Sequence, residues 1–214
     1  MNLFATLAGR GLYVITDGPR PDLLEVCAQA LAGGARLLQY RDKTHDAARR
    51  QREATALKVL CHAHGVPLII NADIALAMAV GADGLHIGPE DAELATARQL
   101  MGNEAIIGVS CMASLARAEA AADGGANYVS FGAFHPSRTK PLAGRAPIEL
   151  LGRSAALGIP RVAIGGITPD NGCLLVAAGA DFLAAISAVF RADDVRAAAQ
   201  RFSDLYLPAH GTSA

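Results

Sequence analysis

A loop rich in hydroxyl groups and cations follows the strand-like run YVSFGAF at 128–134. In its sequence HPSRTKP, Ser137 and Thr139 can donate hydrogen bonds to an anion. Arg138 and Lys140 add two positive charges. The two prolines reduce the entropy that the loop would lose on closing over a ligand. The segment predicts phosphate or pyrophosphate binding, with a solvated Lys/Arg turn as the alternative.

Polar residues also end other apolar runs of the chain, where a buried strand has little reason to carry them unless they meet a ligand. They are Gln39, Arg41, Asp42 and Lys43 after the second run, Asn71 after the third, Asp91 beyond the fourth, Ser110 at the fifth, and Ser187 at the eighth. The seventh run ends in Gly165-Gly166, which would let backbone N–H groups approach a phosphate. Relief of crowding is the alternative role for this glycine pair.

The histidines support more than one interpretation. His86, inside GLHIG, could face a ligand or form a structural hydrogen bond, and His135 beside the cationic loop could touch phosphate or transfer a proton. His62 and His64 lie near a predicted helix end, where we expect solvent exposure. The sequence contains neither GxGxxG nor GxxxxGK[ST], so it signals neither a dinucleotide fold nor a P-loop.

Composition predicts one domain that spans 1–214, with 207–214 as a flexible tail. The chain has 214 residues, 52% of them hydrophobic, and a net charge of −1 that does not suit nucleic-acid binding. Four widely spaced cysteines indicate buried thiols in a reducing compartment. The N-terminus lacks a secretory pattern, and no segment approaches about 20 apolar residues. We expect a cytoplasmic protein with small-molecule substrates and no membrane partner; a homo-oligomer stays open.

A repeated pattern sets the elements that must position these residues: an Ala-rich helical stretch, a glycine, and a β-branched run. The glycines are Gly34, Gly65, Gly81, Gly125, Gly158 and Gly179, and the predicted strands are 12–16, 35–41, 66–71, 84–88, 105–111, 128–134, 161–166 and 182–187. Ser114 and Thr168 suit helix N-caps, with Pro169 at a first helical position. Eight strand–helix units favour a single-domain (β/α)8 TIM barrel over an open doubly wound sheet, and they place the strand-end residues on one rim.

Taken together, these motifs resemble the thiamine phosphate synthase family from YVITD at 13–17 to ISAVF at 186–190. The specific pieces are QYRDK at 39–43, IIN at 69–71, GADGLHIGPED at 81–91, IGVS at 107–110, SRTK at 137–140, AIGGI at 163–167 and IS at 186–187. The resemblance implies a magnesium-dependent transferase that joins hydroxymethylpyrimidine pyrophosphate to thiazole phosphate. Pyrophosphate leaves first in such a reaction, and the thiazole nitrogen captures the pyrimidine cation.

The resemblance also assigns site residues. It implies pyrimidine-substrate contacts at Gln39, Arg41, Lys43, Asn71, Ser110 and Lys140, thiazole-phosphate contacts at Ser137, Thr139, Gly166, Ile186 and Ser187, further substrate-binding positions at Tyr40, Asp42 and Arg138, catalytic roles for Arg41, Ser110 and Lys140, and a magnesium carboxylate at Asp91.

The chain departs from the family pattern at three positions. Ala72 stands where the family usually has a second magnesium-binding Asp, and Asp73 follows it. His135 replaces a usual Phe, and Ser137 replaces a common Thr while keeping the hydroxyl. Two alternatives stay open: a thiazole tautomerase of the same fold, favoured by His135, and a non-catalytic barrel that binds a phosphorylated ligand, favoured by Ala72.

Overall fold

Eight parallel strands close into a barrel, in a computed structural model that describes residues 7, 9–136 and 145–207. The strands are β1 (Gly11–Ile15), β2 (Leu37–Tyr40), β3 (Leu68–Asn71), β4 (Gly84–Ile87), β5 (Ile106–Met112), β6 (Tyr128–Phe131), β7 (Arg161–Ile164) and β8 (Phe182–Ala185). Each strand pairs with its neighbour along the chain, and β1 also pairs with β8, with Leu12 opposite Leu183. The closed (β/α)8 barrel is therefore confirmed, and the open sheet is excluded.

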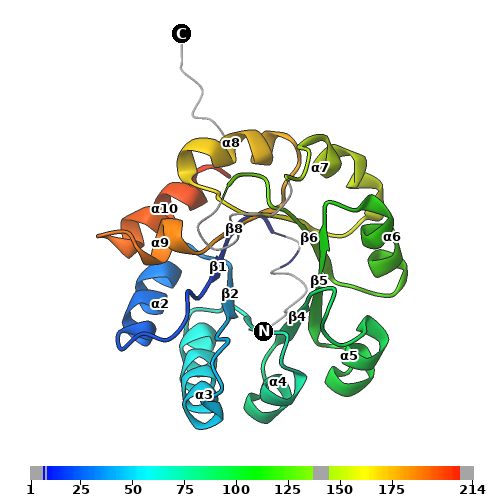
Figure 1. Cartoon of the computed structure of the whole chain (residues 1–214). Helices are drawn as coiled ribbons and strands as arrows, with labels where there is room; N and C mark the ends of the chain where they lie inside the picture. The colour runs from blue at the N-terminus through cyan, green and yellow to red at the C-terminus, as the bar shows by residue number, and fades with distance from the viewer. Residues whose placement is uncertain (1–6, 8, 137–144, 208–214) are drawn as a thin grey trace.

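Helices form a ring around the strands, as Figure 1 shows. They are α2 (Leu23–Ala32), α3 (Ala47–Ala63), α4 (Ile74–Val80), α5 (Leu94–Met101), α6 (Leu115–Asp123), α7 (Glu149–Arg153), the 3-10 turn η1 (Ala155–Leu157), α8 (Pro169–Ala177), α9 (Ser187–Phe190) and α10 (Val195–Asp204). The loops after the strands all open on the same end of the barrel, which we call the mouth.

The predicted junctions between helix and strand are present. All six glycines of the repeated pattern have positive φ, between 60° and 106°. Ser114 caps α6 by accepting a hydrogen bond from Arg117 N, and Thr168 forms a capping box with Asn171 ahead of Pro169. Local sequence therefore sets where these helices begin and end.

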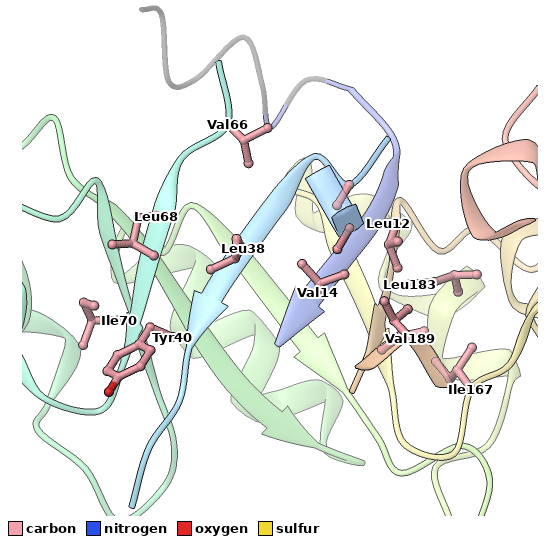
Figure 2. Close-up of a cluster of buried hydrophobic side chains, with 14 of the residues drawn as sticks. Leu12, Val14, Leu38, Tyr40, Val66, Leu68, Ile70, Ile167, Leu183 and Val189 are labelled. Carbon is pink, nitrogen blue, oxygen red and sulfur yellow. The ribbon is translucent and has the colours of Figure 1, made fainter. Parts of the chain in front are cut away.

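The apolar core has two layers because strand side chains alternate between the barrel interior and the helices. The outer layer joins strands to helices, and Figure 2 shows Leu38, Tyr40 and Ile70 in it. The inner layer fills the barrel with side chains such as Leu37 and Phe182. The alternation decides which strand-end residues can face a ligand.

The cysteine prediction needs one correction. Cys27, Cys61 and Cys111 are buried free thiols, as expected, but Cys173 is exposed on α8. Its neighbour Leu174 is also exposed, at 63%, so this face of α8 points away from the strands.

In the described part of the chain, no helix is both long enough and apolar enough to cross a membrane.

Candidate active site

A group of polar side chains faces the interior of the barrel near its mouth. Counting alternate residues from the inner-layer members of each strand gives Gln39, Asn71, His86, Ser110 and Ser130 from β2 to β6. Ser130 is buried and lies opposite Ser110 in the β5–β6 register. We missed Ser130 in the sequence, although its place two residues after inward-facing Tyr128 gives the signal.

Four of the interior side chains form one continuous hydrogen-bond chain. Gln39 Nε2 donates to the Tyr13 hydroxyl at 2.7 Å, and the Tyr13 and Tyr128 hydroxyl oxygens are 2.8 Å apart. The Tyr128 oxygen lies 3.0 Å from His86 Nδ1. Burial raises the pKa of both tyrosines and lowers the pKa of His86 to about 4, so all four groups are neutral near pH 7.

Tyr40 and Asp42 face the helices rather than the barrel interior. The Tyr40 hydroxyl donates to Glu53 of α3 at 2.7 Å, and Arg49 Nη2 lies 2.7 Å from Asp42 Oδ2. Burial alone would raise the pKa of Asp42, but hydrogen bonds from Thr44 and Arg49 outweigh it and lower the pKa. These contacts fasten the β2–α3 loop to α3.

Arg41 and Lys43 alternate with those two residues along the same loop. Thr16 fixes the backbone of Arg41, since its hydroxyl accepts from Arg41 N at 2.8 Å and donates to Arg41 O at 3.0 Å. The Arg41 side chain is partly buried, which lowers its pKa, and no described side chain forms an ion pair with it. Lys43 is exposed. Both cations are thus available to an anionic ligand.

The turn after β3 explains what Asp73 does. Ala72 has φ of 62°, and its N–H donates to His86 O at 2.9 Å. This turn directs Asp73 to cap α4 through Leu76 N and to pair with Arg50 at 2.8 Å. Asp73 therefore serves the start of α4.

Asp91, the predicted magnesium carboxylate, lies in the loop that follows β4. It is exposed, and its Oδ2 accepts from Gly88 N at 2.6 Å. Over 7, 9–136 and 145–207, no group of three His, Cys, Asp or Glu side chains could hold a metal by itself. A divalent cation here would need ligands from the substrate and from water in addition to Asp91.

The Gly165-Gly166 pair allows two loops to pack closely. A Cβ at Gly165 would collide with Ala133, and one at Gly166, where φ is 61°, would collide with the Pro136 carbonyl. His135 N also donates to Gly165 O at 3.0 Å. Relief of crowding is therefore a confirmed role of these glycines. The predicted ligands Ser137, Arg138, Thr139 and Lys140 lie outside the described residues, and so does most of the expected tail at 207–214.

Ile186 and Ser187 stand where β8 leads into α9, on the same rim. Arg20 holds the far end of this short helix, because its Nη1 donates to Phe190 O at 2.8 Å. Asp22 fixes the Arg20 guanidinium through hydrogen bonds of 2.6 and 2.9 Å. The β1 and β8 loops are thereby joined, which fixes Ser187 at the mouth.

The family model and the relatives found by sequence agree on one family. The family model described as thiamine monophosphate synthase matches residues 12–189. The chain is 55% identical to the thiamine-phosphate synthase of Xanthomonas campestris pv. campestris strain 8004, over 90% of this chain and 94% of that protein. It is 51% identical to the enzyme of the same name from Chromobacterium violaceum, over 89% of this chain and 93% of that protein.

A solved structure gives the same result. Thiamine phosphate pyrophosphorylase from Pyrococcus furiosus is 34% identical and superposes with a TM-score of 0.84, over 95% of this chain and 97% of the other. The sequence match covers residues 12–189, and the structural match covers 95% of this chain, so both extend over nearly the whole barrel. The chain therefore belongs to the thiamine-phosphate synthase family.

Proposed function

We propose that the mouth of this barrel joins hydroxymethylpyrimidine pyrophosphate to thiazole phosphate, giving thiamine phosphate and pyrophosphate. The family to which the chain belongs is a family of transferases that release pyrophosphate. The observation that supports the site most is the grouping of inward amides and hydroxyls near the loop that carries Arg41, which has no ion pair among the described residues. The tautomerase and the non-catalytic barrel have less support, because relatives with 51–55% identity carry the synthase name.

The pyrimidine ring would occupy the interior end of the site. Gln39, Asn71 and Ser110 offer amide and hydroxyl groups from three strands, within a wall of buried apolar side chains. Neutral hydrogen-bonding groups suit a heteroaromatic ring, whereas a charge would be costly to desolvate there. We assign these three residues to the ring and Ser130 to the same pocket.

The pyrophosphate would lie further out, against Arg41 and Lys43 and against the predicted cationic loop with Lys140. The bond between the pyrimidine methylene carbon and the pyrophosphate oxygen breaks, and its electron pair leaves with pyrophosphate. The thiazole nitrogen then donates its own pair to the methylene cation. Because negative charge grows on the leaving group, fixed cations accelerate this step. Holding the thiazole in line contributes the rest.

The thiazole phosphate would bind between the β7 and β8 loops. Gly166, Ile186 and Ser187 offer backbone N–H groups and one hydroxyl there, and Ser137 and Thr139 are the predicted partners from the β6 loop. Tyr40 and Asp42 act indirectly, through their contacts with α3. By holding the β2–α3 loop on α3, they set the positions of Arg41 and Lys43.

Magnesium fits this site only when substrate completes its coordination. Asp91 is one exposed carboxylate, Ala72 offers none, and Asp73 is engaged by α4 and Arg50. Magnesium commonly binds through one or two carboxylates together with substrate phosphates and water. When bound, it would neutralise charge on the leaving pyrophosphate.

We also place the protein in the cytoplasm, since buried free thiols such as Cys27 suit a reducing compartment.

The direct test mixes purified protein with both substrates and magnesium and measures thiamine phosphate and pyrophosphate. Equal amounts of the two products are expected, with none in chelator. Conversion of a thiazole tautomer without coupling would instead establish the tautomerase. Binding of both substrates without any product would establish the non-catalytic barrel.

A matched set of carboxylate variants tests the magnesium assignment. We expect Asp91→Asn to lower coupling by about tenfold or more and Asp73→Asn to act mainly on stability. Ala72→Asp should lower the magnesium concentration for half-maximal rate. Its backbone already has the left-handed conformation that Asp tolerates better than Ala does. Unchanged magnesium dependence in Asp91→Asn would refute the assignment.

A further inference from the structure

We propose that Tyr13, Tyr128 and His86 are positioning residues whose hydrogen-bond chain runs in one direction and fixes the side-chain amide of Gln39 for the pyrimidine substrate. The inference rests on the proposed function and adds a specificity rule to it. With its Nε2 committed to Tyr13, Gln39 keeps Oε1 as the acceptor for a ligand. The site then selects a ring that presents an N–H donor.

With the Gln39 amide oriented as in the structure, so that Nε2 faces Tyr13, the direction follows from counting protons. Each tyrosine hydroxyl has a single proton, and the Tyr13 oxygen already accepts from Gln39 Nε2. If Tyr13 donates to Tyr128 and Tyr128 donates to His86 Nδ1, every proton in the chain has an acceptor. The reverse direction leaves the Tyr13 proton without one, and an unsatisfied buried donor costs about 1–3 kcal/mol.

The same count fixes the state of His86. Its Nδ1 must accept from Tyr128, so the proton of the neutral ring lies on Nε2. Burial supports the neutral form, since it lowers the pKa of His86 to about 4. His86 pairs in register with Asn71, so its Nε2–H is a donor at the level of the proposed ring site. One chain thus sets an acceptor on Gln39 and a donor on His86.

The packing keeps room for this chain. The Tyr128 ring stacks on His86 with centroids 5.6 Å apart and meets Tyr13 edge-on at 5.9 Å. Gly108 provides the space, because a Cβ there would collide with the Tyr128 ring. Phenylalanine would fill the same volume beside Ile106 without needing any partner. Since an apolar pair can replace a buried hydrogen bond at little cost, packing alone does not explain two hydroxyls.

Two variants and their combination test the chain by substrate binding. Tyr13→Phe and Tyr128→Phe should each weaken binding of hydroxymethylpyrimidine pyrophosphate by about tenfold, measured by calorimetry, and leave thiazole phosphate binding unchanged. The double variant should be no worse than Tyr13→Phe alone, since both changes break one chain. Tyr206→Phe is the control, because it removes a buried hydroxyl from a side chain that packs against the outer layer and takes no part in this hydrogen-bond chain. Additive losses, or equal losses for both substrates, would overturn the proposal.

A measurement on the free protein separates this proposal from the proposed function. Nitrogen chemical shifts of the His86 ring, assigned by their loss in His86→Gln, should show the proton on Nε2 in the wild type and a mixture of tautomers in Tyr128→Phe. A proton on Nδ1 in the wild type would refute the chain without any variant having to fold. Failure of the wild type to form thiamine phosphate would refute the proposed function. The tautomer of His86 tests the hydrogen-bond chain independently of that activity.

Discussion

The two ends of the barrel treat charge differently. At the end where the strands begin, Asp83 accepts from Lys58 Nζ at 2.5 Å and from Leu68 N at 2.8 Å. Arg98 donates there to Ala105 O at 2.7 Å and Gly125 O at 3.0 Å. At the mouth, Arg41 has no ion pair within the described residues. The mouth also has ion pairs, such as Arg50 with Asp73, but Arg41 is left for a ligand there.

This difference separates stability from activity within one fold. Paired groups at the strand starts tie consecutive units of the barrel together, and their loss should lower the free energy of unfolding. An unpaired cation at the mouth contributes little to folding, and its desolvation opposes it. Variants at the two ends should therefore change different measurements, which gives three tests of decreasing size.

Arg41→Met should give the largest effect on catalysis. It removes a fixed cation beside the leaving pyrophosphate, and we expect kcat/KM to fall about 100-fold, or about 2.7 kcal/mol of transition-state stabilisation. The melting temperature should stay within about 2 °C, because the guanidinium has no ion pair in the described structure to lose. A large drop in melting temperature with normal coupling would reverse the assignment of this residue.

Asp83→Asn should give the largest effect on stability. Removing the carboxylate leaves Lys58 near a buried site without its counter-charge, so the free energy of unfolding should fall by about 2–3 kcal/mol at pH 7. Coupling kinetics should not change. Denaturant unfolding checks the first expectation, and unchanged KM values for both substrates check the second.

The effect of Asp83→Asn on the free energy of unfolding should also depend on pH, in a direction that can be tested. Burial by itself would raise the pKa of Asp83. Hydrogen bonds from Lys58, Leu68 N and His62 outweigh burial and hold the pKa below the ordinary value of 3.8. The stabilisation is present above the unfolded pKa and is lost as the pH falls through the lower folded pKa. The difference between wild type and Asp83→Asn should therefore shrink below about pH 4. A constant difference from pH 7 to pH 2 would contradict this.

Much of the fold could be predicted from the sequence because its signals are local. Glycine after each helix, as at Gly81, and capping residues such as Ser114 act on their own neighbours. Continuous apolar runs then identify strands covered on both faces. Closure of the barrel followed from the number of units. All eight predicted strands are present. β1 and β5 keep their predicted lengths but are shifted by one residue, β1 to begin at Gly11 and β5 to end at Met112, and the other six are one to three residues shorter at one or both ends.

The site was harder to predict, because side-chain direction and partners depend on residues far apart in the sequence. The motif QYRDK does not show that Tyr40 turns to Glu53 of α3 while Gln39 turns to Tyr13 of β1. Nor does it show that Asp73 is held by Arg50, 23 residues away. Tyr128 looked like an ordinary strand residue, and only the closed barrel brings it to His86.

Two Ser→Ala variants, one at each end of the barrel, should give the smallest effects. Ser187→Ala removes one hydroxyl from the proposed phosphate cradle at the mouth, and the KM for thiazole phosphate should rise about fivefold, or about 1 kcal/mol. Ser154→Ala removes a buried hydroxyl that donates to Leu150 O at 2.8 Å, on the opposite side of the barrel from the mouth. It should lower stability by about 1 kcal/mol and leave both KM values unchanged. Steady-state kinetics and denaturant unfolding on both variants provide the comparison. If Ser154→Ala also raised the KM for thiazole phosphate, the separation of stability from activity between the two ends would fail, because a loss of packing far from the mouth would then reproduce the loss of a ligand contact.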